Sequence, residues 1–235
     1  MKKLISLICV LAMVLALAAC GSSAPAAATE APAASAEAPA EDVSADKTFV
    51  VGICQLVQHP ALDAATQGFK DALTEALGDK VTFQEQNASG DSATCSLICN
   101  QFVSDEVDLI MANATASIQA AASATNTIPI LGTSITDYGV ALGVDNWTGV
   151  SGTNISGTSD LAPLDGQAAM IQELFPDAKT IGLLYCSGEP NSIFQADSME
   201  ALLTDMGYSV ERYTFADSND VSSVTANACS NADVL

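Results

Sequence analysis

The chain has 235 residues, of which 28 are acidic and 7 are basic, and its formal net charge at pH 7 is −21. So acidic a chain offers no basic surface to neutralise phosphates, which argues against nucleic acid and anionic lipid headgroups as partners. The hydrophobic share of 49% is that of a globular protein, and the length allows one or two small domains.

The first twenty residues have the pattern of an export signal. Lys2 and Lys3 precede an uninterrupted run of small and apolar residues from Leu4 to Ala19. At roughly 16 residues this run is shorter than the ~20 that a membrane-spanning helix needs. The stretch "LAAC" that ends at Cys20 resembles the lipobox of bacterial lipoproteins, which implies lipid on Cys20 and an anchor at the outer face of the cytoplasmic membrane. An ordinary cleaved signal that happens to contain a cysteine is the alternative.

Residues 21–47 form a different kind of segment. They are Ala, Pro, Ser and acidic residues, with no aromatic side chain and a single valine. This composition buries too little apolar surface to offset the entropy of ordering. We therefore expect a disordered linker over 21–47 and a folded part that begins near Thr48.

Beyond the linker, short apolar runs alternate with stretches of helical periodicity. We expect strands at Phe49–Val57, Lys80–Gln86, Val107–Ala112, Ile128–Gly132, Val150–Asn154, Thr180–Tyr185 and Ser209–Phe215, with a further strand beginning at Ala232. Helical spacing covers 62–76, 95–103, 117–125, 165–176, 191–207 and 221–229.

This alternation predicts an α/β protein. Its strands are continuously apolar, which is typical of parallel sheets covered by helices on both faces. The rhythm is interrupted near 149–160, so we expect two lobes, at 48–158 and 159–235. Because the sequence stops inside a predicted strand, we expect the second lobe to be incomplete at its C-terminal end.

Polar side chains follow four of the predicted strands. In open parallel sheets, ligands bind outside the carboxyl ends of the strands, where helix N-termini offer free backbone N–H groups. The residues at these ends suit hydrogen bonding to a small zwitterion or polar solute, although each could simply cap a helix. The candidate ligand-binding residues are Gln55, His59, Asn113, Thr115, Thr133, Thr136, Asp137, Ser187, Glu189, Asn191 and Ser192.

His59 is the only histidine of the chain and precedes Pro60. Proline suits the first turn of a helix, so His59 should lie at or beside the N-cap. We expect a neutral imidazole that either contacts a ligand or orders the turn between strand and helix.

The sequence gives little support to catalysis or metal binding. It contains no G-x-S-x-G elbow, no phosphate-binding P-loop and no H-E-x-x-H motif. An exported hydrolase would have to recruit His59 as its base. Cys95 and Cys99 share a helix face and could be half of a metal site, but plain packing is favoured because no second pair of ligands is near. We expect no catalytic residue, no cofactor and no metal.

Several stretches together resemble a known family, among them "VGICQLVQHPALDAATQGFKDAL", "IPILGTSITD" and "LFPDAKTIGLLYCSGEPNS". The chain from 47 to 235 is similar to ABC transporter substrate-binding lipoproteins of the tryptophan/tyrosine-binding type. The resemblance implies a type I periplasmic binding protein-like fold, with two Rossmann-like lobes that close on a ligand across a hinge. It also implies ligand contacts near Gln55, His59, Thr115, residues 133–137 and residues 187–192.

The function implied by the resemblance is solute capture. An amino acid, with an aromatic one favoured, would bind between the lobes of a monomeric, membrane-anchored protein and be delivered to an ABC permease. A sensory domain that reports to a receptor or kinase is the alternative, since its fold and pocket could be identical. Trp147 could form a wall of the ligand site or a packed crossover residue, and packing is favoured.

Overall fold

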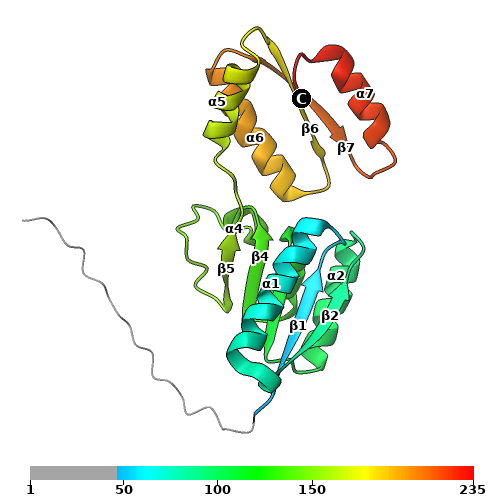
Figure 1. Cartoon of the computed structure of the whole chain (residues 1–235), viewed down its shortest axis with the longest axis vertical. Helices are drawn as coiled ribbons and strands as arrows, with labels where there is room; N and C mark the ends of the chain where they lie inside the picture. Colours follow the sequence, from blue (N-terminus) through cyan, green and yellow to red (C-terminus); the bar gives the residue numbers. More distant parts are fainter. Residues whose placement is uncertain (1–46) are drawn as a thin grey trace, which may run out of the picture. The chain divides into compact units, whose positions relative to one another are not determined.

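The computed structural model describes residues 47–235 (Figure 1). The predicted signal peptide, the lipid-bearing Cys20 and nearly all of the predicted linker lie outside the described residues. The strands are β1 (Phe49–Gln55), β2 (Val81–Asn87), β3 (Leu109–Asn113), β4 (Ile130–Ile135), β5 (Ile155–Ser159), β6 (Thr180–Cys186) and β7 (Ser209–Phe215). The helices are α1 (Pro60–Leu77), the 3-10 turn η1 (Gly78–Lys80), α2 (Ser92–Ser104), α3 (Thr115–Ala124), α4 (Tyr138–Leu142), α5 (Leu164–Leu174), α6 (Pro190–Asp205) and α7 (Val221–Asn231).

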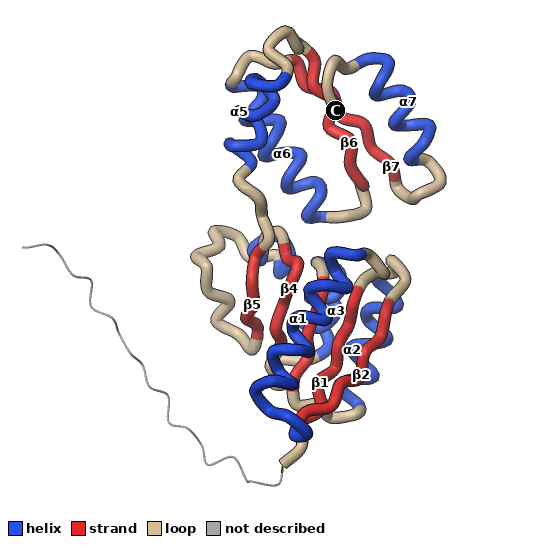
Figure 2. Tube along the Cα trace, in the orientation of Figure 1, coloured by secondary structure: helices blue, strands red, loops and turns tan. Residues whose placement is uncertain are grey.

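The first lobe is built on a five-stranded parallel sheet with the order β2-β1-β3-β4-β5 (Figure 2). Each crossover between its first four strands contains a helix, as parallel pairing requires. The predicted α/β class with parallel sheets is therefore confirmed. The carboxyl ends of all five strands meet at one edge of this sheet.

Helices cover both faces of the five-stranded sheet. On one face Val51, Ile53 and Met111 pack with Phe69 and other apolar residues of α1. On the opposite face α2 and α3 pack over a larger cluster that includes the fully buried Phe102. Because both faces are covered, the strands carry the continuous apolar runs seen in the sequence.

The second lobe has a small parallel sheet of β6 and β7. A parallel bridge joins Ile181 to Val234, where the sequence predicts a further strand. Ala168 of α5, Ile181 of β6 and Leu203 of α6 form its buried core. Within residues 47–235, no helix combines the length and the apolar character needed to cross a membrane.

The last strand of the first sheet differs from the prediction. The sequence analysis places a strand at Val150–Asn154, whereas β5 runs over Ile155–Ser159. Gly149 and Gly152 adopt positive φ angles of 87° and 65°, which interrupt an extended run. Ile155 is the first buried apolar residue after this turn, and it pairs with Ile130 of β4.

A close approach of β1 and α2 at Gly52 gives a test of the packing. A Cβ atom on Gly52 would lie 2.6 Å from Cγ of the buried Phe102. We expect Gly52→Ala to lower the free energy of unfolding by about 1–3 kcal/mol, because the core has no space for the methyl group.

The matched control for this substitution is Gly68→Ala in α1. A Cβ atom at Gly68 meets nothing within 4 Å, and alanine favours the helix by about 0.5–1 kcal/mol. Urea unfolding of both variants should therefore shift in opposite directions. A Gly52→Ala variant as stable as the unmodified protein would contradict the close packing.

Candidate functional site

A buried polar network lies at the carboxyl edge of the five-stranded sheet. Thr66 of α1 donates its hydroxyl to Oε1 of Gln55 at 2.6 Å and accepts Nδ2 of Asn113 at 2.9 Å. Gln55 and Asn113 end the neighbouring strands β1 and β3, and all three side chains are buried. The network thus joins two strand ends to the first helix.

Gln55 also holds the loop between β1 and α1 through hydrogen bonds. Its Nε2 donates to the carbonyl of Val57 at 2.9 Å and to Oδ1 of Asp63 at 2.6 Å. Asn113 Nδ2 makes a further bond, at 2.9 Å, to the carbonyl of Leu62. The predicted site residues Gln55 and Asn113 are therefore brought together, but most of their hydrogen-bonding groups are used inside the protein.

Asn113 Oδ1 is the exception in this network. It is the one buried side-chain polar atom without a hydrogen-bond partner among the described residues. The orientation of the amide is fixed because Nδ2 faces the carbonyl of Leu62, which can only accept. The edge of the sheet therefore retains an unused acceptor beside the start of α3.

His59 is exposed and caps α1. Its Nδ1 accepts the backbone N–H of Ala61 at 3.2 Å, and Pro60 occupies the first turn. The predicted N-cap position is confirmed, and Nδ1 must be unprotonated to accept this bond. The structure thus shows His59 ordering the turn, while a ligand contact by His59 stays a prediction.

The ends of β3 and β4 have unusual backbone conformations. Ala114 has a φ of 88° and Ser134 a φ of 57°, both in the region that favours glycine. Residues held in such backbone conformations are concentrated at active sites and ligand-binding sites. The remaining first-lobe candidates lie next to these two residues or within three positions of them: buried Thr115 and Thr136, half-buried Thr133, and Asp137, whose Oδ1 caps α4 by accepting the N–H of Val140 at 2.8 Å.

The second-lobe candidates follow β6. Ser187 donates its hydroxyl to the carbonyl of Phe215 at 3.2 Å, and Ser192 donates to Oε2 of Glu189 at 2.7 Å. Glu189 occupies the N-cap position of α6, while Asn191 and Ser192 lie in its first turn. All four lie at the carboxyl edge of the small sheet, as predicted.

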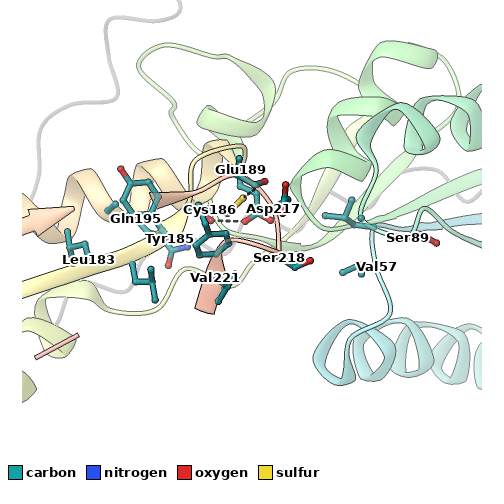
Figure 3. Close-up of a pocket in the computed structure, with 17 residues that line it drawn as sticks. Val57, Ser89, Leu183, Tyr185, Cys186, Glu189, Gln195, Asp217, Ser218 and Val221 are labelled. Carbon is teal, nitrogen blue, oxygen red and sulfur yellow. Dashed lines mark hydrogen bonds between the residues drawn. The ribbon is translucent and has the colours of Figure 1, made fainter. Parts of the chain in front are cut away.

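A pocket of about 880 Å³ is formed mainly by second-lobe residues (Figure 3). Glu189 and Ser192 line it, as do Leu56 and Val57 from the loop after β1. Several further lining residues are not among those predicted from the sequence, namely Leu183, Leu184, Tyr185, Gln195, Phe215, Asp217 and Ser218. Asp217 and Ser218 lie just after the carboxyl end of β7. The rule that ligands bind outside the carboxyl ends of parallel strands, if applied to β7 as well, would have found them.

A second pocket, of about 740 Å³, lies over α1 and the ends of β1 and β2. Gln55 lines it together with Asp63 and Thr66, which the sequence analysis also missed. These two residues lie inside a helix rather than at a strand end. Their spacing of three places them on one helix face, which is the signal that could have indicated them.

Trp147 packs as the favoured interpretation predicts. Its ring stacks on Tyr138 with centroids 6.1 Å apart and an interplanar angle of 17°, against the core of the first lobe. The hydroxyl of Tyr138 donates to the carbonyl of Gly132 at 3.1 Å. Burial, followed by the nearby charge of Asp160, raises the pKa of Tyr138 to about 12.

Cys95 and Cys99 are fully buried against Cys54 of β1. The hydroxyl of Ser117 lies 3.6 Å from the sulfur atoms of both Cys54 and Cys95. The contact with the Cys54 thiol, together with burial, raises the pKa of Cys95 above its ordinary value. The two helix cysteines thus belong to the packing between β1, α2 and α3.

A family model and a curated relative both identify the kind of protein to which this chain is similar. Residues 50–235 match the family model described as ABC transporter substrate binding protein. A curated relative, the tyrosine-binding protein of Clostridioides difficile strain R20291, is 39% identical over 188 residues, which cover 79% of this chain and 54% of the relative. The chain therefore spans about half the length of that relative.

Solved structures agree with this result. The ABC domain in complex with L-Trp from Streptococcus pneumoniae is 32% identical, with a TM-score of 0.75, over 80% of this chain and 65% of that one. A ligand-free, open substrate-binding protein with adhesive properties from Clostridium difficile is 38% identical, with a TM-score of 0.58, over 80% and 64%. The expected type I periplasmic binding protein-like fold is confirmed by these likenesses.

The polar network predicts the effect of removing its central hydroxyl. Thr66→Val should lower the free energy of unfolding by about 1–3 kcal/mol, because Gln55 and Asn113 each lose a buried partner. Thr66→Ser keeps the hydroxyl and serves as the control, with most of the stability retained. Denaturant unfolding of the two variants checks this, and equal losses would contradict a role for the hydroxyl.

Proposed function

Because the chain belongs to the ABC transporter substrate-binding protein family, we propose that it captures an amino acid, preferentially an aromatic one, for import across a bacterial membrane. The observation that carries this proposal is the composition of the pocket of about 880 Å³. It combines the apolar and aromatic side chains of Leu183, Tyr185 and Phe215 with the carboxylates of Glu189 and Asp217. Such a lining suits a ligand with a cationic group beside a hydrophobic side chain.

The ammonium group of the ligand is assigned to this acidic pair. Glu189 already accepts a hydrogen bond from Ser192, which orients its carboxylate. A carboxylate that accepts from an ammonium group makes a charge-assisted bond, stronger than one between neutral groups. The pocket lining contains no lysine or arginine to compete for these carboxylates.

The carboxylate of the ligand is assigned to the first lobe. The N-terminal turn of α3 begins at Thr115, and the first N–H groups of a helix have no partner inside it. These groups and the positive end of the helix dipole favour an anion. The hydroxyls of Thr115 and Thr133 complete the proposed contacts.

Aromatic preference is supported by the lining and by the relatives. Tyrosine and L-Trp appear in the names of two similar proteins, and the pocket offers two aromatic rings. In the proposed mechanism, closure of the lobes desolvates the amino acid through contacts that exist only in the closed form, which shifts the population toward it. The closed form then docks on the permease as a monomer.

Membrane anchoring through Cys20 is part of the same proposal. A lipid anchor keeps the binding protein close to its permease, and several acyl chains on one residue hold a protein at a bilayer stably. Family membership favours transport over the sensory alternative, and it gives no support to a hydrolase.

Calorimetric titration with the twenty amino acids and common sugars tests the ligand class. We expect L-tyrosine or L-tryptophan to bind most tightly, and Glu189→Gln or Asp217→Asn to weaken that binding about tenfold or more, because a charge-assisted bond is lost. Glu173→Gln is the control, since α5 does not line the pocket. Binding of sugars alone, or equal effects of all three substitutions, would overturn the assignment.

Cys20→Ser tests the anchor. The unmodified protein should fractionate with membranes and gain the mass of a lipid, whereas the variant should lose both properties. Ser22→Ala, beside the same position, is the control. Unchanged membrane association of the Cys20 variant would show that the anchor is not on this cysteine.

A further inference from the structure

Arg212 is the only arginine of the chain, and it lies on the small second-lobe sheet. It pairs in register with Leu183 of β6, on the sheet face that α6 covers. Its Nη1 lies 2.7 Å from Oδ1 of Asp197, and its Nε donates to Oε2 of Glu200 at 2.8 Å. Two carboxylates of one helix therefore fix the plane of the guanidinium group.

A third contact of Arg212 is made with the neighbouring strand β6. Its Nη1 donates to the hydroxyl of Tyr185 at 3.2 Å, and its guanidinium carbon lies 6.0 Å from the centre of the Tyr185 ring. Tyr185 is half-buried and lines the pocket of about 880 Å³ (Figure 3). Arg212 is not itself a lining residue, but it contacts the aromatic lining residue Tyr185.

Attachment of α6 to the sheet does not require this third contact. The bonds to Asp197 and Glu200 already join β7 to α6, and exposed ion pairs of this kind add little stability. Holding the Tyr185 side chain has a different effect. A side chain that is ordered before binding loses less entropy when a ligand packs on it, which improves affinity.

We propose that Tyr185 is a contact for the ring of an aromatic ligand and that Arg212 positions it. This inference rests on the proposed function and adds to it a pair of residues that sets the preference for aromatic amino acids. Aromatic rings attract one another beyond the effect of buried area alone, so a fixed tyrosine ring favours an aromatic side chain over an aliphatic one. Arg212 acts only through Tyr185 and does not itself touch the ligand.

A double-mutant cycle with L-tyrosine as the probe tests the pair. We expect Arg212→Gln to weaken binding about threefold to tenfold, and Tyr185→Leu to weaken it about tenfold or more. Tyr185→Phe keeps the ring, which Arg212 also contacts, but removes the hydroxyl that Arg212 holds, so Arg212→Gln should have a clearly smaller effect in that background. Arg212→Lys retains a donor and should restore part of the affinity.

Lys47→Gln is the matched control. Lys47 also combines an ion pair, with Asp108 at 2.6 Å, and a ring contact, with Phe49 at 5.0 Å, but it lies at the opposite end of the first-lobe sheet. Its loss should leave the affinity for L-tyrosine unchanged. Thermal unfolding of every variant separates a lost contact from a lost fold.

The outcomes distinguish the two proposals. If the unmodified protein binds none of L-tyrosine, L-tryptophan and L-phenylalanine, the proposed function is wrong and the inference falls with it. If the unmodified protein binds them and Arg212→Gln is neutral, or is equally harmful with Tyr185 and with Phe at that position, only the inference is overturned. Equal weakening of L-leucine and L-tyrosine binding by Tyr185→Leu would likewise reject the role in specificity.

Discussion

The first lobe depends on a three-residue hydrogen-bond network buried beneath the carboxyl edge of its sheet. Thr66 joins Gln55 at the end of β1 to Asn113 at the end of β3, and all three are buried. Buried polar groups are costly unless paired, so this network fixes where both strands end and how α1 sits above them. This network also fixes the positions of the loop after β1 and of the start of α3. The proposed function uses both segments to bind the ligand.

In the proposed function, the two lobes provide their ligand-binding groups in different ways. In the first lobe, the side chains of Gln55 and Asp137 make their hydrogen bonds within the protein, so the proposed contacts to a ligand come from backbone N–H groups and hydroxyls. In the second lobe, Glu189 and Asp217 line an open pocket beside aromatic rings. The proposed function accordingly assigns the anionic group of the ligand to the first lobe, and its cationic group and hydrophobic side chain to the second lobe.

The periodicity of the sequence was enough to predict most of the alternating elements and the parallel sheets, and Pro60 was enough to predict the N-cap position of His59, because these follow from local patterns. The short helix α4 was not predicted. The position of β5 was not predictable, since two glycine turns and the long-range pairing of Ile155 with Ile130 decide it. The expectation that ligands bind at the carboxyl ends of strands identified the pocket-lining residues Glu189 and Ser192. It could not identify Tyr185 or Thr66, which also line pockets. Tyr185 lies within a strand, and tertiary packing decides which way its side chain points. Thr66 lies within a helix, where its spacing from Asp63 on one helix face was the only local signal.

The buried thiols of Cys54, Cys95 and Cys99 have a consequence for how the chain reaches its fold. Outside the cytoplasm, where we propose the protein works, thiols are readily oxidised to disulfides. Disulfide exchange needs an accessible thiolate, and the native core offers neither access nor a low pKa at Cys95. Oxidation therefore competes with folding until α2 docks on β1, and from then on burial in the core protects the three sulfur atoms.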